Sequence, residues 1–490
     1  MALLNELIII DDKAGVSVYL QITNLFIHHI RQGRLRKGLK LPGSRELAGM
    51  LGINRMTVVA AYQELEAQGW IEMLPKKGTF IKATLPLLSP KALAGDVADF
   101  QLPAQPGFIY DKKRIIPVGS SNLPSAGKLA FNDGFPDVRL APIEELTRCM
   151  RSLSRLSANK KYLLYGDAQG TLLLRRTLAN FLCDTRGLSI TAENILITNG
   201  AQMGIFIAAS VIISPGDAVI VGVPGYNMAN MTFQQLGAKL IYVPVDEEGI
   251  DTNAIEKLCE KKKIRMVYVI PHHHNPTTVT LSPERRMHLL SLATKYRFAV
   301  IEDDYDYDFH YSSKPIMPMA SYDSQGNVIY IGTLTKTFAP AVRLGFIVAP
   351  KEFIQTGTNF RKIVDTQGDS LLENAIAELY KDGTIVRHIK KSVKLYKERR
   401  DHFCDCLQKE LSDQVSFKVP DGGMSVWTTS LQHDLKVIAR KAFDHGLIMK
   451  DGTSYDIGRQ RFNAVRLGFA SLNFKEQLQA VKIIKEVTAM

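Results

Sequence analysis

Five short apolar runs that each end in polar or glycine-rich residues constrain the fold of this chain more than any other feature. They are NILITNG (194–200), AVIVGVPGY (218–226), RMVYVIPHHHNP (265–276), RFAVIEDDYD (297–306) and VIYIGTLTK (328–336). Longer amphipathic stretches alternate with them, which is typical of an α/β domain. In open α/β sheets, ligands bind outside the carboxyl ends of the strands, so we expect these ends to meet at one pocket.

Length and composition predict more than one domain. With 490 residues, the chain is too long for one typical domain. Residues 1–82 are helix-rich, residues 83–127 are rich in Pro, Gly, Ser and Ala, and residues 128–490 carry the α/β pattern. The middle composition is typical of a linker between two domains.

The sequence indicates a cytoplasmic protein without a membrane partner. No apolar run is long enough to span a bilayer, and the first residues lack the pattern of a signal peptide. The five cysteines form no paired framework, which is typical of a reducing compartment. The formal net charge of +12 invites a polyanionic partner, but charge alone does not make the chain a nucleic-acid binder.

Residues 18–81 predict three helices followed by a hairpin. Ser44 is expected to cap a helix that Gly52 ends, and Asn54 to cap a second helix that Gly69 ends. Two helices joined by a tight glycine-containing turn form a helix-turn-helix.

The cationic residues of this segment favour DNA binding. Arg55 and Thr57 lie in the first turn of the second helix, where a recognition helix meets the major groove. The hairpin predicts a wing with Lys76 and Lys77 at its tip, suited to phosphate or minor-groove contact. The alternative is a small helical domain with a basic surface, because helix-turn-helix patterns also arise by chance.

The segment resembles the winged helix-turn-helix domain of the GntR family in LPGSRELAGMLGINRMTVVAAYQELEAQGW (41–70) and in KKGTF (76–80). The resemblance covers the whole segment. It implies that a double-stranded DNA operator is bound by Ser44, Arg45, Arg55, Thr57, Lys76, Lys77, Gly78 and Thr79.

Lys336 stands among threonines at the end of an apolar run, and Arg343 follows it. A lysine amine can hold an aldehyde cofactor covalently as a Schiff base. Pyridoxal phosphate also needs donors for its phosphate, which Thr333, Thr335 and Arg343 can supply. Taken alone, a lysine after TLT is most often a solvated loop residue.

Other strand ends supply the rest of a cofactor site. Asp303 can pair with a pyridinium nitrogen, Tyr305 can donate to the ring hydroxyl, and Tyr226 can stack on the ring. TNGAQM opens a helix whose first backbone N–H groups suit a phosphate, at Gly200, Ala201 and Gln202. Each feature alone is explained by an acidic turn or an ordinary helix start, but together they favour a pyridoxal phosphate site.

Residues 128–488 resemble the fold-type I aminotransferases, and the GntR-like segment makes the whole chain similar to MocR/GabR-type transcriptional regulators. The resemblance lies in FNDGFPDVRLAP (131–142), YGDAQGTLLLRRTLANFLCDTRGL (165–188), IEDDYDYDFHY (301–311), GTLTKTFAPAVRLGF (332–346) and AVRLGFASLN (464–473). It implies a mostly parallel central sheet with helices on both faces and a small carboxy-terminal α+β subdomain. It also implies that Lys336 carries pyridoxal phosphate.

The resemblance assigns three further residues. It implies that Tyr165 reaches the cofactor phosphate across a dimer interface, that Asn275 contacts the ring hydroxyl, and that Arg466 grips a substrate carboxylate, a bidentate task that suits a guanidinium. The chain departs from its relatives at two places. Met228 replaces a second arginine of GABA-responsive relatives, and HHHNPTT (272–278) replaces a commoner SHQ pattern, so that Asn275 fits catalytic aminotransferases better.

The resemblance predicts a homodimeric regulator that senses an amino compound, or pyridoxal phosphate itself, through aldimine chemistry at Lys336. Closure of the smaller subdomain would shift the DNA-binding modules on paired half-sites. A working aminotransferase with an accessory DNA-binding domain is the alternative. A degenerate site that serves only dimerisation is the third hypothesis, weakened by the intact Lys336, Asp303 and Arg343.

Two tempting patterns predict no additional site. His272, His273 and His274 would point to alternating faces of a strand, so we expect no metal there. Cys404 and Cys406 lie two apart in an expected helix and share no face, so a packing or surface role is expected rather than a redox pair.

Overall fold

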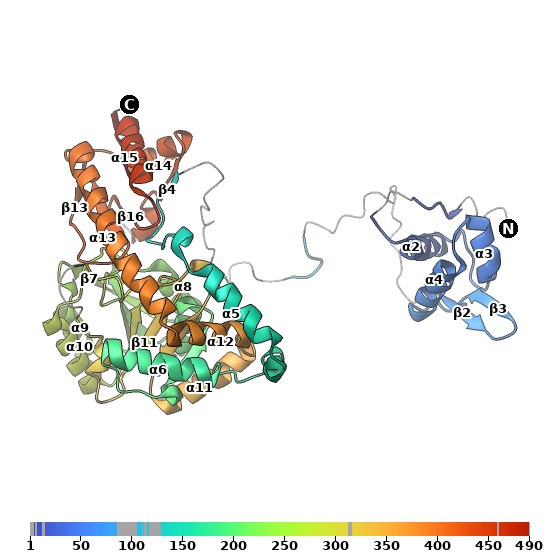
Figure 1. The fold of residues 1–490 in the computed structure, drawn as a ribbon, viewed down its shortest axis with the longest axis horizontal. Coiled ribbons are helices and arrows are strands. Elements are labelled where there is room, and N and C mark those ends of the chain that lie inside the picture. The colour runs from blue at the N-terminus through green and yellow to red at the C-terminus, as the bar shows by residue number, and fades with distance from the viewer. Residues whose placement is uncertain are drawn as a thin grey trace. The chain divides into compact units, whose positions relative to one another are not determined.

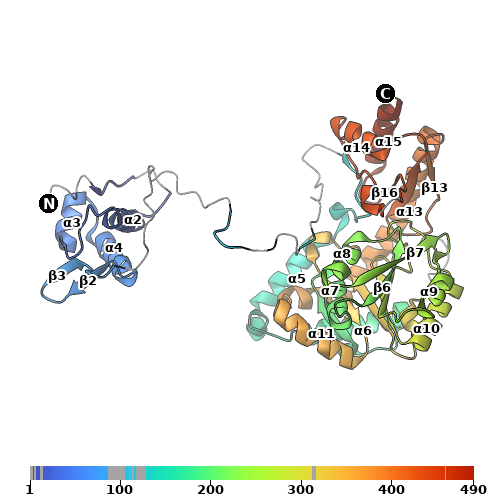
Figure 2. The same ribbon diagram turned by 180° about the vertical axis from the view of Figure 1, so that it is seen from behind.

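The computed structural model describes residues 4, 7–11, 15–85, 105–109, 111, 115–116, 129–311, 316–457 and 460–489. The chain forms two compact units, Met1–Tyr110 and Asp111–Met490 (Figures 1 and 2). Most of the predicted linker 83–127 lies outside the described residues. None of the helices in the described part of the chain is long and apolar enough to cross a membrane.

The first unit contains the predicted three helices and hairpin. The helices are α2 (Val18–Arg31), α3 (Ser44–Leu51) and α4 (Arg55–Ala67), and the strands are β1 (Lys40–Leu41), β2 (Ile71–Leu74) and β3 (Gly78–Ile81). The antiparallel sheet has the order β1-β3-β2. Its core gathers one apolar face of each helix, including Phe26, Leu47, Val58 and Leu65, against Trp70 and Ile71 of the hairpin. Apolar burial of this kind is what holds short helices in place.

Local capping explains how the helix-turn-helix is formed, with one correction to the sequence prediction. The Asn54 side chain accepts a hydrogen bond of 2.8 Å from the Met56 backbone N–H, and Gly52 adopts the left-handed φ of 65° that ends α3. Ser44, however, is not the N-cap of α3. The helix begins one residue earlier than predicted, with Gly43 as N-cap, and the Ser44 hydroxyl instead lies 3.5 Å from Nε of Arg55.

An eight-stranded sheet with the order β5-β12-β11-β10-β9-β6-β7-β8 forms the centre of the second unit. Its strands are β5 (Ile195–Thr198), β6 (Ala218–Val223), β7 (Lys239–Asp246), β8 (Gly249–Ile250), β9 (Met266–Val269), β10 (Ala299–Asp304), β11 (Val328–Thr333) and β12 (Gly345–Val348). Only the pairings of β12 and of β8 are antiparallel. The five predicted apolar runs are therefore β5, β6, β9, β10 and β11, and their carboxyl ends share one edge of the sheet.

Helices cover both faces of this sheet, as predicted (Figures 1 and 2). Side chains alternate between the faces along each strand, so Leu196 enters one core while Ile195 and Ile197 enter the other. One face is covered by α7 (Ala201–Ile212), α8 (Asn227–Gln235) and α11 (Lys351–Val364). The other is covered by α6 (Leu172–Arg186), α9 (Thr252–Cys259), α10 (Pro283–Tyr296) and α12 (Ser370–Lys381).

A small α+β subdomain completes the second unit, again as predicted. The antiparallel strands β13 (Val415–Phe417), β14 (Ser425–Ser430) and β16 (Ala464–Gly468) pack with α13 (Thr384–Leu411), α14 (Leu435–Asp444) and α15 (Phe474–Ala489). Cys404 and Cys406 of α13 are both buried in this core. Strand β4 (Leu129–Ala130) joins the subdomain by pairing in parallel with β15 (Leu447–Ile448).

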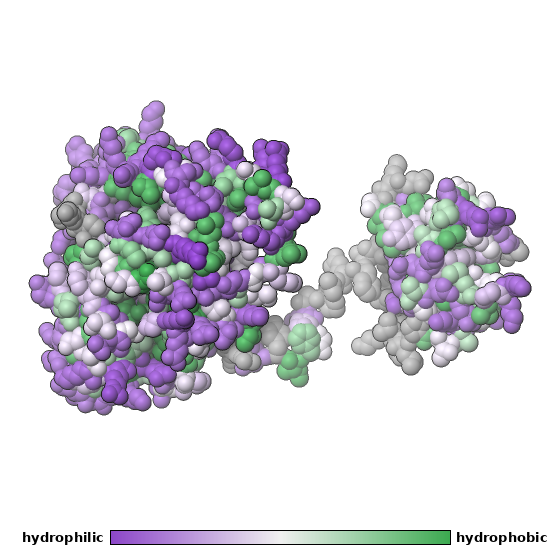
Figure 3. Space-filling model, turned by 60° about the horizontal axis from the view of Figure 1, so that its bottom comes forward, coloured by the Kyte–Doolittle hydropathy of each residue, from purple (hydrophilic) through white to green (hydrophobic). Residues whose placement is uncertain are grey.

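The molecular surface that faces the viewer in Figure 3 is mostly hydrophilic, with small scattered apolar patches.

Candidate functional site

Lys336 lies in the turn that follows β11, at the edge where the parallel strands end. Its Nζ donates a hydrogen bond of 2.8 Å to the Gly134 carbonyl oxygen and lies 4.0 Å from the centre of the Phe135 ring. Burial and the nearby Arg466 guanidinium lower the pKa of Lys336 to about 7. A large fraction of the amine is therefore neutral at neutral pH, which is the form that attacks an aldehyde.

Asp303 is the penultimate residue of β10, near this lysine, and is buried. Its Oδ2 accepts a 2.7 Å hydrogen bond from the hydroxyl of Tyr268 on β9, whereas Oδ1 has no partner among the described residues. Burial raises the pKa of Asp303 to about 7, assisted by the Asp304 and Asp306 carboxylates. An unpaired buried carboxylate oxygen is costly, and a pyridinium N–H would satisfy it.

Arg466 on β16 is fully buried and lies close to the same point. Its Nη2 donates a 2.8 Å hydrogen bond to the hydroxyl oxygen of Tyr305, which in turn donates to the His273 carbonyl oxygen at 2.8 Å. Nε and Nη1 of Arg466 have no hydrogen-bond partner within the described part of the chain. The guanidinium therefore keeps free donors, as a carboxylate-binding arginine requires.

The predicted phosphate ligands also come together. The hydroxyls of Thr333 and Thr335 lie 2.9 Å apart, and Arg343 Nη2 donates to the Asn199 carbonyl oxygen at 3.0 Å. Gly200, the N-cap of α7, has a φ of 83°, and a Cβ there would lie 2.7 Å from Arg343 Nη2. The glycine thus lets the guanidinium approach the first N–H groups of α7, at Ala201 and Gln202, where a helix end favours an anion.

The remaining predicted cofactor residues, Tyr226, Asn275 and Tyr165, differ in how far they are buried. Tyr226 is the N-cap of α8, and burial together with the nearby Asp303 carboxylate raises its pKa. Asn275 is half-buried in the loop after β9. Tyr165 is not packed into the site of its own chain, because its side chain is 89% exposed. An exposed aromatic side chain at this place is available to a second copy of the chain.

The three histidines do not lie on a strand, contrary to the prediction, because β9 ends at Val269 and they occupy the following loop. All are buried and each bonds a different partner: His272 with Asp304 at 3.1 Å, His273 with Asp306 at 2.8 Å and His274 with Thr277 at 2.8 Å. Across the described ranges, no group of three or more histidine, cysteine or carboxylate side chains is placed to hold a metal ion.

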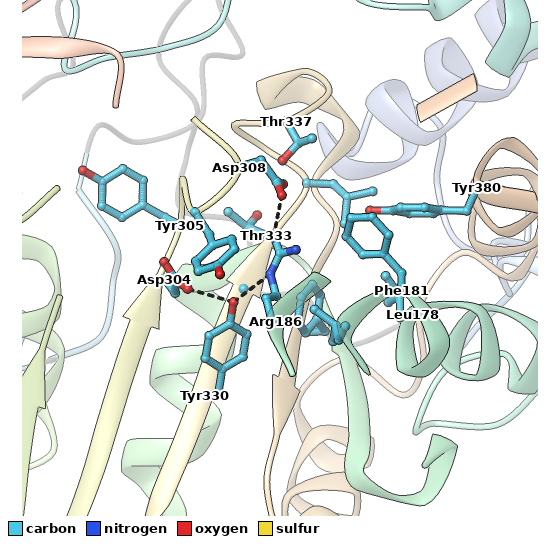
Figure 4. A pocket seen from close by; sticks show the side chains of 15 residues that line it. Leu178, Phe181, Arg186, Asp304, Tyr305, Asp308, Tyr330, Thr333, Thr337 and Tyr380 are labelled. Carbon is cyan, nitrogen blue, oxygen red and sulfur yellow. Dashed lines mark hydrogen bonds and ion pairs between the residues drawn. The ribbon is translucent and has the colours of Figure 1, made fainter. Parts of the chain in front are cut away.

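A second polar network lies next to the cofactor residues and was not foreseen from the sequence (Figure 4). Arg186 pairs with Asp308 at 2.8 Å and lies 3.3 Å from the hydroxyl of Tyr330, which donates to Asp304 at 2.9 Å. These side chains line a cavity of about 20 Å³, room for about one water molecule. The Tyr330 hydroxyl and the nearby Arg186 guanidinium stabilise the charged carboxylate of Asp304. Its neighbour Asp303 takes no part in this network and bonds Tyr268 instead.

Sequence reasoning also missed the segment that covers Lys336. Asp133, Gly134 and Phe135 belong to FNDGFPDVRLAP, a stretch that indicated the family but received no individual roles. Gly134 is 202 positions from Lys336, so only packing of β4 onto the carboxy-terminal subdomain brings the two together.

The lowered pKa of Lys336 predicts how its reactivity depends on pH. The rate at which cofactor-free protein attaches pyridoxal phosphate should rise with pH up to about 7 and then level off, because the amine is deprotonated above that value. Stopped-flow absorption at the cofactor's visible band measures this rate. A rate that keeps rising toward the ordinary lysine value of about 10.4 would contradict the proposed environment.

On the first unit, the predicted DNA-binding residues lie on the surface. Arg45, Arg55, Lys76, Lys77 and Gly78 are exposed, and Ser44, Thr57 and Thr79 are partly exposed. Ser44 and Arg45 are on α3, Arg55 and Thr57 are in the first turn of α4, and the others lie at or beside the β2–β3 turn. The helix and the hairpin tip therefore present exposed cationic groups to phosphate, and among the described residues Arg55 makes a weak contact with Ser44.

Comparison with known proteins identifies both units. Residues 126–484 match the aminotransferase class I and II family, and residues 18–81 match the gntR family of bacterial regulatory proteins. The chain is 30% identical to aromatic-amino-acid aminotransferase 1 of Thermococcus litoralis, over 73% of this chain and 87% of that protein. It is 27% identical to the probable rhizopine catabolism regulatory protein MocR of Rhizobium meliloti, over 98% and 95% of the two chains.

Solved structures agree with this assignment. Kynurenine aminotransferase of Pyrococcus horikoshii, crystallised with PMP, superimposes with a TM-score of 0.69 and 28% identity over 74% of this chain and 91% of that chain. Pyridoxal phosphate is the cofactor of this family, and Oδ1 of Asp303, which has no partner among the described residues, fits the cofactor's ring nitrogen. The chain therefore belongs to the aminotransferase class I and II family and, through its GntR-type DNA-binding domain, to the MocR-type transcriptional regulators.

Proposed function

We propose that this regulator controls transcription in response to an amino compound that bears a carboxylate. The observation that carries the proposal is a set of buried groups around Lys336 without partners among the described residues, namely Asp303 Oδ1 and the Nε and Nη1 donors of Arg466. Such groups cost stability unless a ligand satisfies them, so they support a working binding site rather than a silent fold.

Each residue has a task that follows from its chemistry. Asp303 would hold the cofactor's ring nitrogen, and Thr333, Thr335, Arg343 and the first turn of α7 would hold its phosphate. When bound, the cofactor supplies an aldehyde that condenses reversibly with primary amines. Lys336 holds or releases it, and Arg466 orients the ligand's carboxylate.

A homodimer would connect this site to DNA. The exposed Tyr165 is available to reach the cofactor phosphate of a second copy, and a symmetric dimer presents two recognition helices to paired half-sites. A ligand can change DNA binding only if it favours one arrangement of the dimer over another. A regulator of this kind works where the DNA is, so we place the protein in the cytoplasm.

The test uses the full chain with pyridoxal phosphate and an operator selected from a random pool of duplex DNA. Amino acids are titrated while the visible absorption of the bound cofactor and the affinity for the operator are followed together. The proposal expects at least one amino acid to change both at the same concentration. If absorption changes without any effect on DNA binding throughout the panel, the regulatory role is refuted.

Arg55→Ala should weaken operator binding. A contact from the first turn of α4 to a base or phosphate contributes about 1–3 kcal/mol, which is roughly 5- to 150-fold in affinity. Arg440→Ala, at an exposed arginine on α14 of the other unit, is the matched control. Equal affinities of the Arg55→Ala variant and the wild type, measured at one salt concentration, would remove α4 from the interface.

An active aminotransferase remains the second candidate function. The observation in its favour is the completeness of the site, including Asn275, together with the 30% identity to an aminotransferase. Incubation with an amino acid and a keto acid distinguishes the two functions. Sustained formation of a second amino acid over many turnovers would establish the enzyme, whereas one conversion per site would leave a sensor.

A further inference from the structure

We infer that the effector is an amino acid with a second, cationic amino group at the end of its side chain, and that Asp133 is the residue that selects it. This inference rests on the proposed function of the Lys336 site and names the class of ligand. Three features of the segment around Asp133 carry it: its position, its incomplete pairing and the apolar ring beside it.

The position of Asp133 follows from the contacts of Gly134. The Gly134 carbonyl oxygen accepts the hydrogen bond from Lys336 Nζ. Gly134 has a φ of 81°, and a Cβ there would lie 3.4 Å from Arg466 Nη2. Gly134, the residue next to Asp133, therefore contacts Lys336, whose amine the ligand's α-amine would replace, and lies near Arg466, which would receive the ligand's α-carboxylate.

The Asp133 carboxylate lies within electrostatic reach of the groups around Lys336. It is one of the charges that act on Lys336, and it also acts on Tyr226 and on Tyr455, whose pKa is raised by burial and by this carboxylate. These side chains come from three different parts of the fold. Asp133 thus belongs to the surroundings of Lys336 rather than to an unrelated surface.

Its pairing is incomplete. Oδ2 of Asp133 contacts Nζ of Lys450 and the Tyr455 hydroxyl also approaches the carboxylate, while Oδ1 is buried and has no hydrogen bond of normal geometry among the residues described. The Lys450 side chain is 47% exposed and the Asp133 side chain is 27% exposed. The lysine can move into solvent at little cost, because exposed ion pairs are weak.

A ligand ammonium would complete this arrangement. It would donate to the unpaired Oδ1 and replace the Lys450 ammonium at Oδ2, while the methylene groups of the ligand pack on the Phe135 ring, which is 40% exposed. An acidic side chain would be repelled by Asp133, and an alkyl side chain would leave Oδ1 unpaired. The charge pattern therefore favours diamino acids over acidic and aliphatic ones.

The experiment compares ligands that differ only in the terminal amine. Lysine, ornithine and 2,4-diaminobutyrate are titrated against norleucine, norvaline and 2-aminobutyrate, with the holoprotein's visible absorption and calorimetry as readouts. We expect at least one diamino acid to bind about 10- to 100-fold more tightly than its alkyl counterpart, the value of one charge-assisted hydrogen bond.

Variants locate the selecting residue. Asp133→Asn should remove this preference, so that lysine and norleucine bind alike, and Asp413→Asn, at an exposed aspartate elsewhere, should change nothing. Lys450→Met removes the competing ammonium at an exposed position and should tighten diamino acid binding. It also serves as an independent test if Asp133→Asn unfolds at a lower temperature than the wild type.

The outcomes separate this inference from the proposed function. If alkyl and diamino acids bind alike, or Lys450→Met weakens diamino acid binding, the inference is overturned while the sensor survives. If no amino acid of either set changes the absorption spectrum, the proposed function falls with it. A strong preference that Asp133→Asn leaves intact would assign selection to another residue and refute the role of Asp133.

Discussion

Lys336→Ala is expected to yield a protein that cannot attach pyridoxal phosphate covalently. The wild type should show a visible absorption band, and borohydride should make the cofactor's bond to the protein permanent. The variant should lose all its cofactor on denaturation after borohydride treatment. The reason is that Lys336 has the lowered pKa and the position beside Asp303 and Arg466 that the reaction requires. Mass spectrometry of the borohydride-treated chains measures the attachment.

Lys381→Ala is the matched control, because that lysine is exposed on α12 and pairs with Glu378 on the same helix. It should retain the full mass increase. Cofactor that stays bound to Lys336→Ala after denaturation would show that another lysine carries it. A wild-type protein that stays colourless with added pyridoxal phosphate would remove the cofactor from the function altogether.

Arg466→Met should abolish the response to amino acids but not to simple amines. The Arg466 guanidinium has two nitrogens, Nε and Nη1, without partners in the described chain, and these are the donors a carboxylate would use. Two charge-assisted hydrogen bonds of about 1.5–3 kcal/mol each make the expected loss of affinity about 100-fold or more. Titration with norleucine and with pentylamine, which lacks the carboxylate, measures the effect.

Comparing norleucine with pentylamine controls for damage to the fold. Pentylamine should bind the variant about as well as it binds the wild type, since it makes no use of Arg466, and this separates a lost contact from a damaged fold. Arg466→Lys keeps the charge but not the planar fork, so it should recover only part of the affinity for norleucine. An equal loss for both ligands would mean that Arg466 only supports Tyr305, to which it donates.

Much of the site could be predicted because its residues follow strands. Asp303 and Lys336 come at or just after the ends of neighbouring parallel strands, β10 and β11. Parallel strands bring their carboxyl ends to one edge, so residues far apart in the sequence are placed together by strand direction alone. The place of Arg55 in the first turn of α4 could also be predicted, because the Asn54 cap fixes where α4 begins.

The two predictions that failed concerned the exact ends of a helix and of a strand. Ser44 was expected to be a cap, but the start of α3 shifts by one residue to Gly43. The histidines of HHHNPTT were expected on a strand, but β9 ends sooner and leaves them in a buried loop. Element ends are governed by competition among local hydrogen bonds of similar energy, which a pattern of residue types does not resolve.

The sequence by itself determined the two-part organisation, the kind of domain on each side and the lysine most suited to carry the cofactor. Only the tertiary structure decided that Gly134 lies against Lys336, that Tyr268 donates to Asp303, and that Oδ1 of Asp133 is buried without a hydrogen-bond partner in the described part of the chain. Strand direction and capping are local properties that residue patterns encode. Contacts between segments 202 positions apart arise from the packing of whole elements, and they determine which charge a ligand meets.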